Sequence, residues 1–198
     1  EYMENEFRKQ NLDVKKYLGQ DKRLIKDNLN NLVNDKKISK KLKNHKDINN
    51  GSLACLISHT SLYKKLLDEE GEVFLIFEDD SQILDNFKQN VKNYEKYFPE
   101  DWDMLWLGHG RLKGENINEY ILKPKNNPGL GYNAQHHCYL IRKASIEKIL
   151  DILLPADKFQ PKDSILRNNF DKFNAYFLIP NLATQDRKTF RKSERETN

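Results

Sequence analysis

Residues Val73-Phe74-Leu75-Ile76-Phe77 are followed at once by Glu78-Asp79-Asp80, so five apolar side chains stand directly before three carboxylates. A continuous apolar run of this length, partly β-branched and aromatic, predicts a strand buried on both faces of a sheet. Such strands are typical of α/β folds, in which ligands bind outside the carboxyl ends of the strands. We therefore expect the acidic triplet at the functional edge of a sheet.

Further apolar runs predict more strands, and helical patterns separate them. The strands are predicted at residues 104–107, 139–141 and 176–179, with a further short one at 14–18. Apolar residues at helical spacing predict helices over 21–33, from Ser52 to the stop at 69–71, over 83–97 and over 144–154. This alternation favours a Rossmann-type α/β fold with a mainly parallel sheet flanked by helices.

The length and composition fit one domain with a basic end. In a chain of 198 residues we expect a single domain over residues 1–186 and a flexible basic tail over 187–198. No apolar stretch approaches the ~20 residues needed for a transmembrane segment, and no signal-peptide core is visible. We expect a cytoplasmic or membrane-peripheral protein, with an ER-lumen-like compartment as the alternative.

The two cysteines, Cys55 and Cys138, are far apart and lie among apolar residues. Buried free thiols are favoured over a disulfide, which agrees with a reducing compartment. No Cys/His spacing indicates a zinc site.

The charge pattern does not indicate nucleic acid as a partner. The net charge is +4, with basic runs at 36–46 and 187–195. Such runs are usually solvated faces, and here no aromatic residues alternate with them and no helix-turn-helix or ribonucleoprotein motif is present.

The acidic triplet predicts a metal site. Three adjacent carboxylates repel one another unless a positive charge compensates them, and a hard divalent cation with oxygen ligands does this. The alternative is an acidic helix cap at Asp80 or Ser81, which accounts for one acid well and for three poorly. A rival pair, Asp101 and Asp103, precedes the strand predicted at 104–107, so we expect it at the opposite edge, in a turn.

Several blocks in order resemble glycosyltransferase family 25, the family of lipooligosaccharide and procollagen β-galactosyltransferases. The similarity runs from about Tyr17 to Gln185. The blocks are GSLACLISH at 51–59, FLIFEDD at 74–80, WDMLWLG at 102–108, HCYLI at 137–141 and PKD at 161–163.

The resemblance implies a GT-A-like fold and a metal-dependent glycosyltransferase. The implied reaction is inverting transfer of a sugar, most often galactose and alternatively glucose, from a UDP-sugar donor to a hydroxyl of a saccharide, glycolipid or protein. The implied cofactor is Mn²⁺, with Mg²⁺ as the alternative. Asp80 would be the principal metal ligand, and Glu78 and Asp79 would hold the metal, the ribose or a bound water.

The resemblance also suggests donor contacts and a general base. Ser58, His59, His109 and His137 would contact the donor, although a histidine on an amphipathic helix is more often structural. Inverting transfer needs a base for the acceptor hydroxyl, and Asp163 matches the family's late Pro-x-Asp block. The alternative role of Asp163 is to cap a helix beginning at Ser164.

One departure from the family pattern concerns the start of the chain. Family members begin with a hydrophobic strand and an Arg-containing segment that helps to hold the nucleotide. The sequence opens at Glu1-Tyr2-Met3, within what would be the next helix. This departure leaves a second hypothesis open, a non-catalytic glycosyltransferase-like binding module that has lost part of the donor site.

Overall fold

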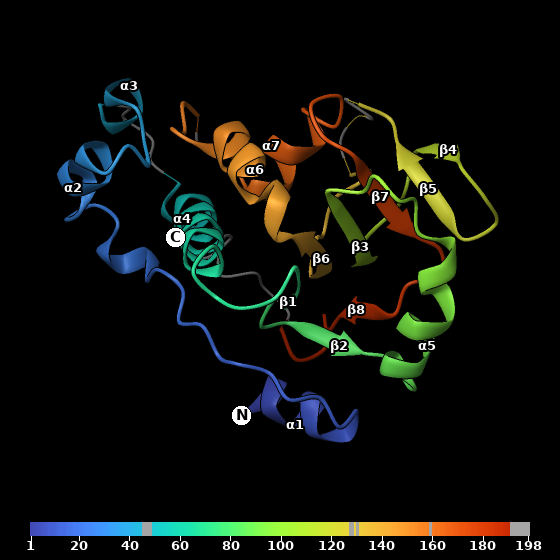
Figure 1. Cartoon of the computed structure of the whole chain (residues 1–198). Coiled ribbons are helices and arrows are strands. Elements are labelled where there is room, and N and C mark those ends of the chain that lie inside the picture. The colour runs from blue at the N-terminus through green and yellow to red at the C-terminus, as the bar shows by residue number, and fades with distance from the viewer. Residues whose placement is uncertain (45–48, 127–128, 130, 159, 191–198) are drawn as a thin grey trace.

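The computed structural model describes residues 1–44, 49–126, 129, 131–158 and 160–190, and its centre is a six-stranded sheet (Figure 1). The strands lie in the order β1-β6-β3-β7-β5-β4. Their bounds are β1 Val73–Phe77, β3 Met104–Gly108, β4 Gly114–Asn116, β5 Ile121–Pro124, β6 Cys138–Arg142 and β7 Ala175–Leu178. Two short strands, β2 (Ser81–Ile83) and β8 (Ala183–Gln185), form a separate antiparallel pair.

Helices flank this sheet. They are α1 Tyr2–Lys9, α2 Leu29–Asn34, α3 Lys40–Lys43, α4 Asn50–Leu66, α5 Phe87–Tyr94, α6 Ile146–Leu153 and α7 Lys162–Arg167. Single 3₁₀ turns occur at Lys22–Leu24, Glu95–Tyr97 and Lys143–Ser145. None of the helices in the described ranges has the length and apolar character needed to cross a membrane.

The α/β class is confirmed, and the strand pairing refines it. Strands β1, β3 and β7 run in one direction, as a Rossmann-type sheet requires. Strand β6 runs the opposite way and lies between β1 and β3, and β5 is antiparallel to both β7 and β4. Consequently β3 and β7 are the only directly parallel neighbours described, and the sheet is mainly antiparallel in its pairing instead of mainly parallel.

Two apolar layers cover the two faces of the sheet. Alternate residues of β3, such as Trp106, face a core formed with α2, α3, α4, α6 and α7, and the Trp106 ring stacks on Phe177 at 4.7 Å between centroids. The intervening residues, such as Leu105, face a second core built with α5, the β2–β8 pair and the apolar side of α1. This alternation is the period-two consequence of strand geometry.

Strand β1 is less buried than its sequence predicts. It pairs with β6 along its whole length, and among the described residues β6 is its one neighbour in the sheet. Val73 is 46% exposed, and Ile76 alone of the five residues is fully buried. The prediction of burial on both faces is wrong because β1 lies at the edge of the described sheet.

Other elements differ from the predicted ones where local signals compete. Residues 14–18 form no strand, and the helix predicted over 21–33 is interrupted between residues 24 and 29. The helix predicted over 83–97 starts at Phe87, because Ile83 belongs to β2 and residues 84–86 form the connection after it. Helix α4 begins at Asn50, two residues before Ser52, because the Asn49 side chain accepts the Ser52 N–H at 2.9 Å and caps the helix.

The basic tail is described in part. Residues 187–190 continue from β8 into a turn in which the Asp186 carboxylate accepts the N–H groups of Lys188 and Thr189. The Phe190 ring packs edge-on against Tyr2. The predicted tail beyond residue 190 lies outside the described residues.

The pair Asp101 and Asp103 lies at the edge of the sheet opposite the acidic triplet, as predicted. Asp103 is buried and accepts hydrogen bonds from Ser145 at 2.5 Å, from Lys148 at 2.8 Å and from the Asn174 N–H at 2.8 Å. Burial opposes ionisation, but these hydrogen bonds outweigh it and hold the pKa of Asp103 below its usual value. Asp103 is therefore a structural carboxylate.

We predict that Asp103→Asn destabilises the fold by about 1–3 kcal/mol, because it weakens hydrogen bonds to a buried charged acceptor. The folded pKa is lowered, so the stabilisation is complete above the unfolded value of about 3.9 and is lost as the pH falls through the folded pKa. Urea unfolding should show a constant deficit near neutral pH that shrinks below about pH 4. Asp101→Asn, at an exposed neighbouring position, is the control; an equal deficit in both variants would contradict the assignment.

His136 is a neutral core residue. Its ring packs on Trp106 at 4.6 Å, and its Nε2–H donates to the Asn133 carbonyl at 3.0 Å. Burial lowers the pKa of His136 from 6.5 to about 3. The unfolded chain therefore binds a proton at this residue at a pH where the folded chain does not.

His136→Gln should flatten the pH dependence of stability between about pH 6.5 and 3. Protonation of the unfolded state lowers the stability of the unaltered chain by about 2 kcal/mol between pH 7.5 and pH 5, and the variant lacks this term. Urea unfolding at these two pH values measures the difference. Parallel pH curves for the two proteins would show that His136 is protonated in the folded state as readily as in the unfolded state.

Candidate functional site

The carboxyl edge of β1 and β3 gathers the predicted site residues. Glu78 follows β1, His109 follows β3, and His137 precedes β6, which runs in the opposite direction. The Glu78 N–H donates to the His137 carbonyl at 2.8 Å. Glu78 and His109 lie at this edge because each follows a strand. His137 joins them because β6 runs antiparallel to β1 and β3, a direction that the sequence does not predict.

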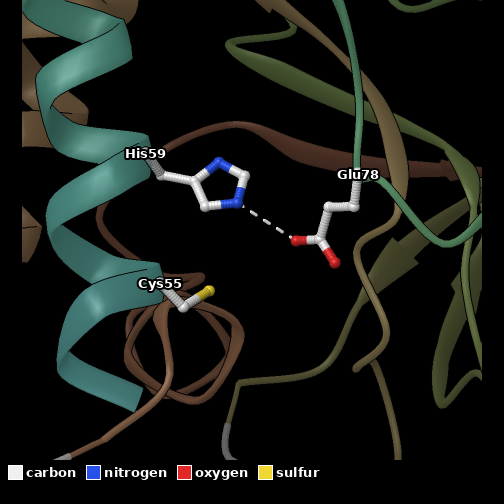
Figure 2. Close-up of side chains that lie close together, drawn as sticks. All are labelled: Cys55, His59 and Glu78. Atoms are coloured by element: carbon white, nitrogen blue, oxygen red, sulfur yellow. Dashed lines mark hydrogen bonds and ion pairs between the residues drawn. The ribbon is translucent and has the colours of Figure 1, made fainter. Parts of the chain in front are cut away.

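Glu78 points toward the helical layer that contains α4. Its Oε1 lies 3.1 Å from His59 Nε2 and 3.2 Å from Lys162 Nζ. Figure 2 shows His59 projecting from α4 toward Glu78, with Cys55 one helical turn earlier. By period-two alternation, Glu78 continues the side of β1 that carries Ile76, which packs in the same layer.

Two tyrosines extend this polar group into the core. The Tyr63 and Tyr139 hydroxyls are 2.7 Å apart, and the Tyr139 hydroxyl is 2.8 Å from His59 Nδ1. Burial raises the pKa of both tyrosines far above the usual value, so both hydroxyls keep their protons. Because a carboxylate only accepts, His59 Nε2–H donates to Glu78, and in the neutral ring Nδ1 accepts from Tyr139.

Lys162 completes the cluster from the start of α7. Its side chain is 1% exposed, and its Nζ lies 4.6 Å from the centre of the Tyr139 ring. A buried ammonium is stable only when it is paired and hydrogen-bonded, and Glu78 provides that partner. Glu78, His59, Lys162, Tyr139, Tyr63 and Cys55 are called the buried polar cluster below.

Within the described residues, the side chains that converge as metal ligands are Cys55, His59 and Glu78, whose ligand atoms lie within 4.8 Å of one another. A thiol and an imidazole suit a borderline-soft ion such as zinc, whereas Mn²⁺ prefers oxygen ligands. The Lys162 Nζ is 3.3 Å from His59 Nε2 and 3.2 Å from Glu78 Oε1, so a cation already lies against this trio. Both cysteines are free thiols, as predicted, and Cys55 is half-buried.

Asp79 and Asp80 occupy the turn between β1 and β2. Asp79 is exposed, and Asp80 is half-buried. Asp80 Oδ2 accepts a short hydrogen bond from the Gln185 side chain, and the Asp80 carbonyl accepts the Asp186 N–H at 2.9 Å. These oxygens fit the preference of Mn²⁺ or Mg²⁺ for carboxylates. That they bind a metal stays a prediction.

A shallow cavity of about 350 Å³ opens beside the β2–β8 pair. Two exposed cations, Arg187 and Lys188, stand at its border. It is lined by Gln82, Gln185, Asp186, Arg187, Lys188 and Thr189. Gln185 therefore contacts both this cavity and Asp80.

The remaining predicted donor contacts have structural partners in the described chain. The Ser58 hydroxyl donates to the Ala54 carbonyl at 2.7 Å and accepts the Gln20 N–H at 2.8 Å, which fastens the segment before α2 to α4. His109 is buried, and its ring nitrogens lie 2.8 Å and 2.9 Å from the carbonyls of Leu178 and Gly110. Burial lowers the pKa of His109. Donor binding by Ser58 and His109 stays a prediction.

His137 packs against the end of β3. Its Nε2–H donates to the Ala183 carbonyl at 3.1 Å, which leaves Nδ1 as an acceptor. No partner for this nitrogen is found among the described residues, although it is buried. A Cβ at Gly108 would lie 2.7 Å from the His137 ring and 2.9 Å from the Ala183 carbonyl oxygen, so the backbone and the ring meet directly here.

Asp163 lies in the first turn of α7, which begins at Lys162 and not at Ser164. Its Oδ1 accepts the Ser164 N–H at 3.1 Å, and its Oδ2 accepts the Gln135 N–H at 3.3 Å. The carboxylate thus joins α7 to the segment before β6. The alternative role as an N-cap is wrong, because Pro161 holds that position, and the role of Asp163 as a base stays a prediction.

The sequence gives signals for most members of the buried polar cluster. Cys55, His59 and Tyr63 follow one another at intervals of four residues, so they share one face of α4. Tyr139 belongs to the apolar run of β6, where alternation places it beside Trp106. Lys162 carries no such signal, since a lysine next to an aspartate at a helix start is ordinarily solvated.

The comparisons with known proteins point to glycosyltransferases. The family described as "Glycosyltransferase family 25 (LPS biosynthesis protein)" matches residues 1–166. A relative from Acanthamoeba polyphaga mimivirus, named "Procollagen lysyl hydroxylase and glycosyltransferase", is 28% identical over 172 residues, which cover 77% of this chain and 19% of that protein. "Procollagen galactosyltransferase 1-B" from Xenopus laevis is 25% identical over 71% of this chain and 23% of its own length.

A third relative differs from these in its name. "Inactive glycosyltransferase 25 family member 3" from Mus musculus is 27% identical over 64% of this chain and 22% of its own length. The chain thus spans about a fifth of the length of these curated relatives. Because the family match extends over most of the sequence and includes the acidic turn and the start of α7, the chain belongs to glycosyltransferase family 25.

Proposed function

We propose that this chain transfers a sugar, galactose most readily and glucose as the alternative, from a UDP-sugar to an acceptor hydroxyl with inversion and with Mn²⁺ or Mg²⁺. The observation that carries the proposal is the acidic turn at the carboxyl edge of the sheet in a family 25 chain. The name of the Xenopus laevis relative supports galactose as the sugar. The acceptor hydroxyl would belong to a saccharide, a glycolipid or a protein, and we place the reaction in the cytoplasm or at a membrane surface, with an ER-lumen-like compartment as the alternative.

The donor diphosphate would lie over the turn that contains Asp79 and Asp80. A bound divalent cation would neutralise charge on the leaving diphosphate. Asp80 is fixed in orientation by the Gln185 side chain, so its carboxylate is preorganised before any ligand arrives. Arg187 and Lys188, beside the cavity next to Gln185, add positive charge for the same phosphates.

His137 offers an acceptor at the same edge. Its Nδ1 is positioned by the bond from Nε2–H to Ala183 and would accept a hydroxyl of the donor or a bridging water. Asp163 would take the proton of the acceptor hydroxyl, because its carboxylate is held by two backbone N–H groups close to the same segment.

A second function is supported by the relative named inactive. Under this alternative the chain binds a nucleotide-sugar without transferring the sugar, as a glycosyltransferase-like binding module. The two functions differ in one measurement, the release of UDP with an acceptor present.

We predict that UDP-galactose with Mn²⁺ raises the melting temperature of the chain. Ligand at 100 times its dissociation constant stabilises a fold by about 2.7 kcal/mol, and 1 kcal/mol corresponds to about 2–4 °C for a domain of this size. Asp80→Ala should abolish the shift because it removes the carboxylate that the turn presents.

The matched control is Asp101→Asn, which alters an exposed acid at the opposite edge of the sheet and should keep the full shift. A donor screen with the same readout ranks UDP-galactose against UDP-glucose. The absence of any metal-dependent nucleotide shift in the unaltered chain would count against both functions.

Asp163→Asn should lower the rate of UDP release by about 10²–10⁴-fold, the usual contribution of a general base. The variant should retain the melting shift with UDP-galactose, because the substitution preserves the side-chain shape and leaves Asp80 in place. Unchanged turnover would exclude Asp163 as the base, whereas nucleotide binding without turnover in the unaltered chain would favour the binding module.

A further inference from the structure

Lys162 is a buried cation next to the acidic turn. Its side chain is 1% exposed, and its Nζ lies 3.2 Å from Glu78 Oε1, on a carboxylate that is 15% exposed. A buried charge of this kind depends on its counter-ion, so the positions of Lys162 and Glu78 fix each other.

The two carboxylates that flank Asp79 are anchored on opposite sides of the sheet. Glu78 joins the buried polar cluster between the sheet and α4. Asp80 instead bonds to Gln185 of β8, and the β2–β8 pair packs on the other apolar layer through Ile83. Asp79, between these two anchors, is the exposed member of the triplet.

We propose that Lys162 is a positioning residue. Its ammonium neutralises Glu78 and holds it in the helical layer, so that Glu78 anchors the turn while Asp79 and Asp80 are the carboxylates that meet the donor-site cation. This inference rests on the proposed function, because it concerns the division of work within the same turn.

The Lys162 ammonium also supplies the positive charge that a metal ion would otherwise bring to Cys55, His59 and Glu78. It lies 3.5 Å from His59 Nδ1 and 3.3 Å from His59 Nε2, in addition to its contact with Glu78. A divalent ion bound by the trio would have to displace Lys162, whose stem is enclosed in protein. Lys162 is therefore the resident cation of this cluster.

A charge-balanced substitution tests the division of roles. The variants are Glu78→Gln, Lys162→Met and the two combined, and the combined variant removes one negative and one positive charge together. Binding of Mn²⁺ in the presence of UDP is measured from the electron paramagnetic resonance signal of free Mn²⁺, and stability from the urea midpoint. Asp80→Asn serves as the ligand-loss reference, and Lys148→Met, which breaks the pair with Asp103 at the far edge, serves as the stability control.

We expect the combined variant to bind Mn²⁺ within threefold of the unaltered chain, and Asp80→Asn to bind at least tenfold more weakly. We expect Lys162→Met alone to lower the urea midpoint more than the combined variant does, because the single change leaves the Glu78 carboxylate without the ammonium that compensates its charge. Lys148→Met should lower the midpoint without changing Mn²⁺ affinity.

Three outcomes would overturn the inference. Tenfold weaker Mn²⁺ binding by a folded combined variant would make Glu78 a metal ligand. Strictly additive losses of stability would show that Lys162 and Glu78 do not depend on each other. A Co²⁺ complex whose thiolate absorption disappears in Cys55→Ser would show that the trio takes a metal in place of Lys162.

Failure of the proposed function is distinguishable from these outcomes. It appears as an absence of Mn²⁺ and UDP binding by the unaltered chain. The double-mutant cycle in urea still decides the pairing of Lys162 with Glu78 in that case, because it requires no ligand.

Discussion

A lysine ammonium enclosed in protein can persist only beside a compensating charge, and this constraint governs the arrangement around Glu78. Lys162 reaches the end of β1 from α7, and His59 reaches the same carboxylate from α4. The consecutive elements α4 and β1 and the distant helix α7 thus meet at one carboxylate. The hydroxyls of Tyr63 and Tyr139 extend the contact inward, so the polar group forms a connected chain of donors that ends on one carboxylate. The contacts of Glu78 with Lys162 and His59 therefore also position the turn that follows Glu78.

The sequence predicts the positions of the apolar strands better than their directions or the short polar strands. Strand β1 and the apolar runs of β3, β6 and β7 lie where their patterns indicate, because short continuous apolar runs are typical of strands inside a sheet. The same patterns do not report strand direction, which depends on how distant segments pair, and so β6 turns an expected parallel arrangement into an antiparallel one. Short polar strands such as β4, whose residues are exposed, carry no apolar period at all.

Some features of the candidate site can likewise be predicted from the sequence, and others cannot. The positions of Glu78 at the carboxyl edge and of Asp103 at the opposite edge follow from the sequence, since Glu78 follows one strand and Asp103 precedes another. The hydrogen bonds that make Asp103 structural come from distant residues. The partners of Glu78 do not follow from its neighbours in sequence. His59 is indicated by its place in a matching block and on one face of α4, whereas the burial of Lys162 is a tertiary fact that no local pattern encodes. Acidic triplets in other chains of this kind can therefore contain one member that faces the interior.

Gly108 illustrates a different type of constraint. The end of β3 touches the His137 ring on one side and the Ala183 carbonyl on the other, and any side chain would enter both within 3 Å. Gly108 has no side chain that could take part in catalysis or binding. Its replacement would nevertheless push the end of β3 away from His137 and Ala183. During neutral evolution, steric overlap would exclude substitutions at position 108. The surrounding apolar positions can exchange one hydrophobic residue for another. A saturation library at this position should therefore return glycine almost alone, even under selection for folding without activity.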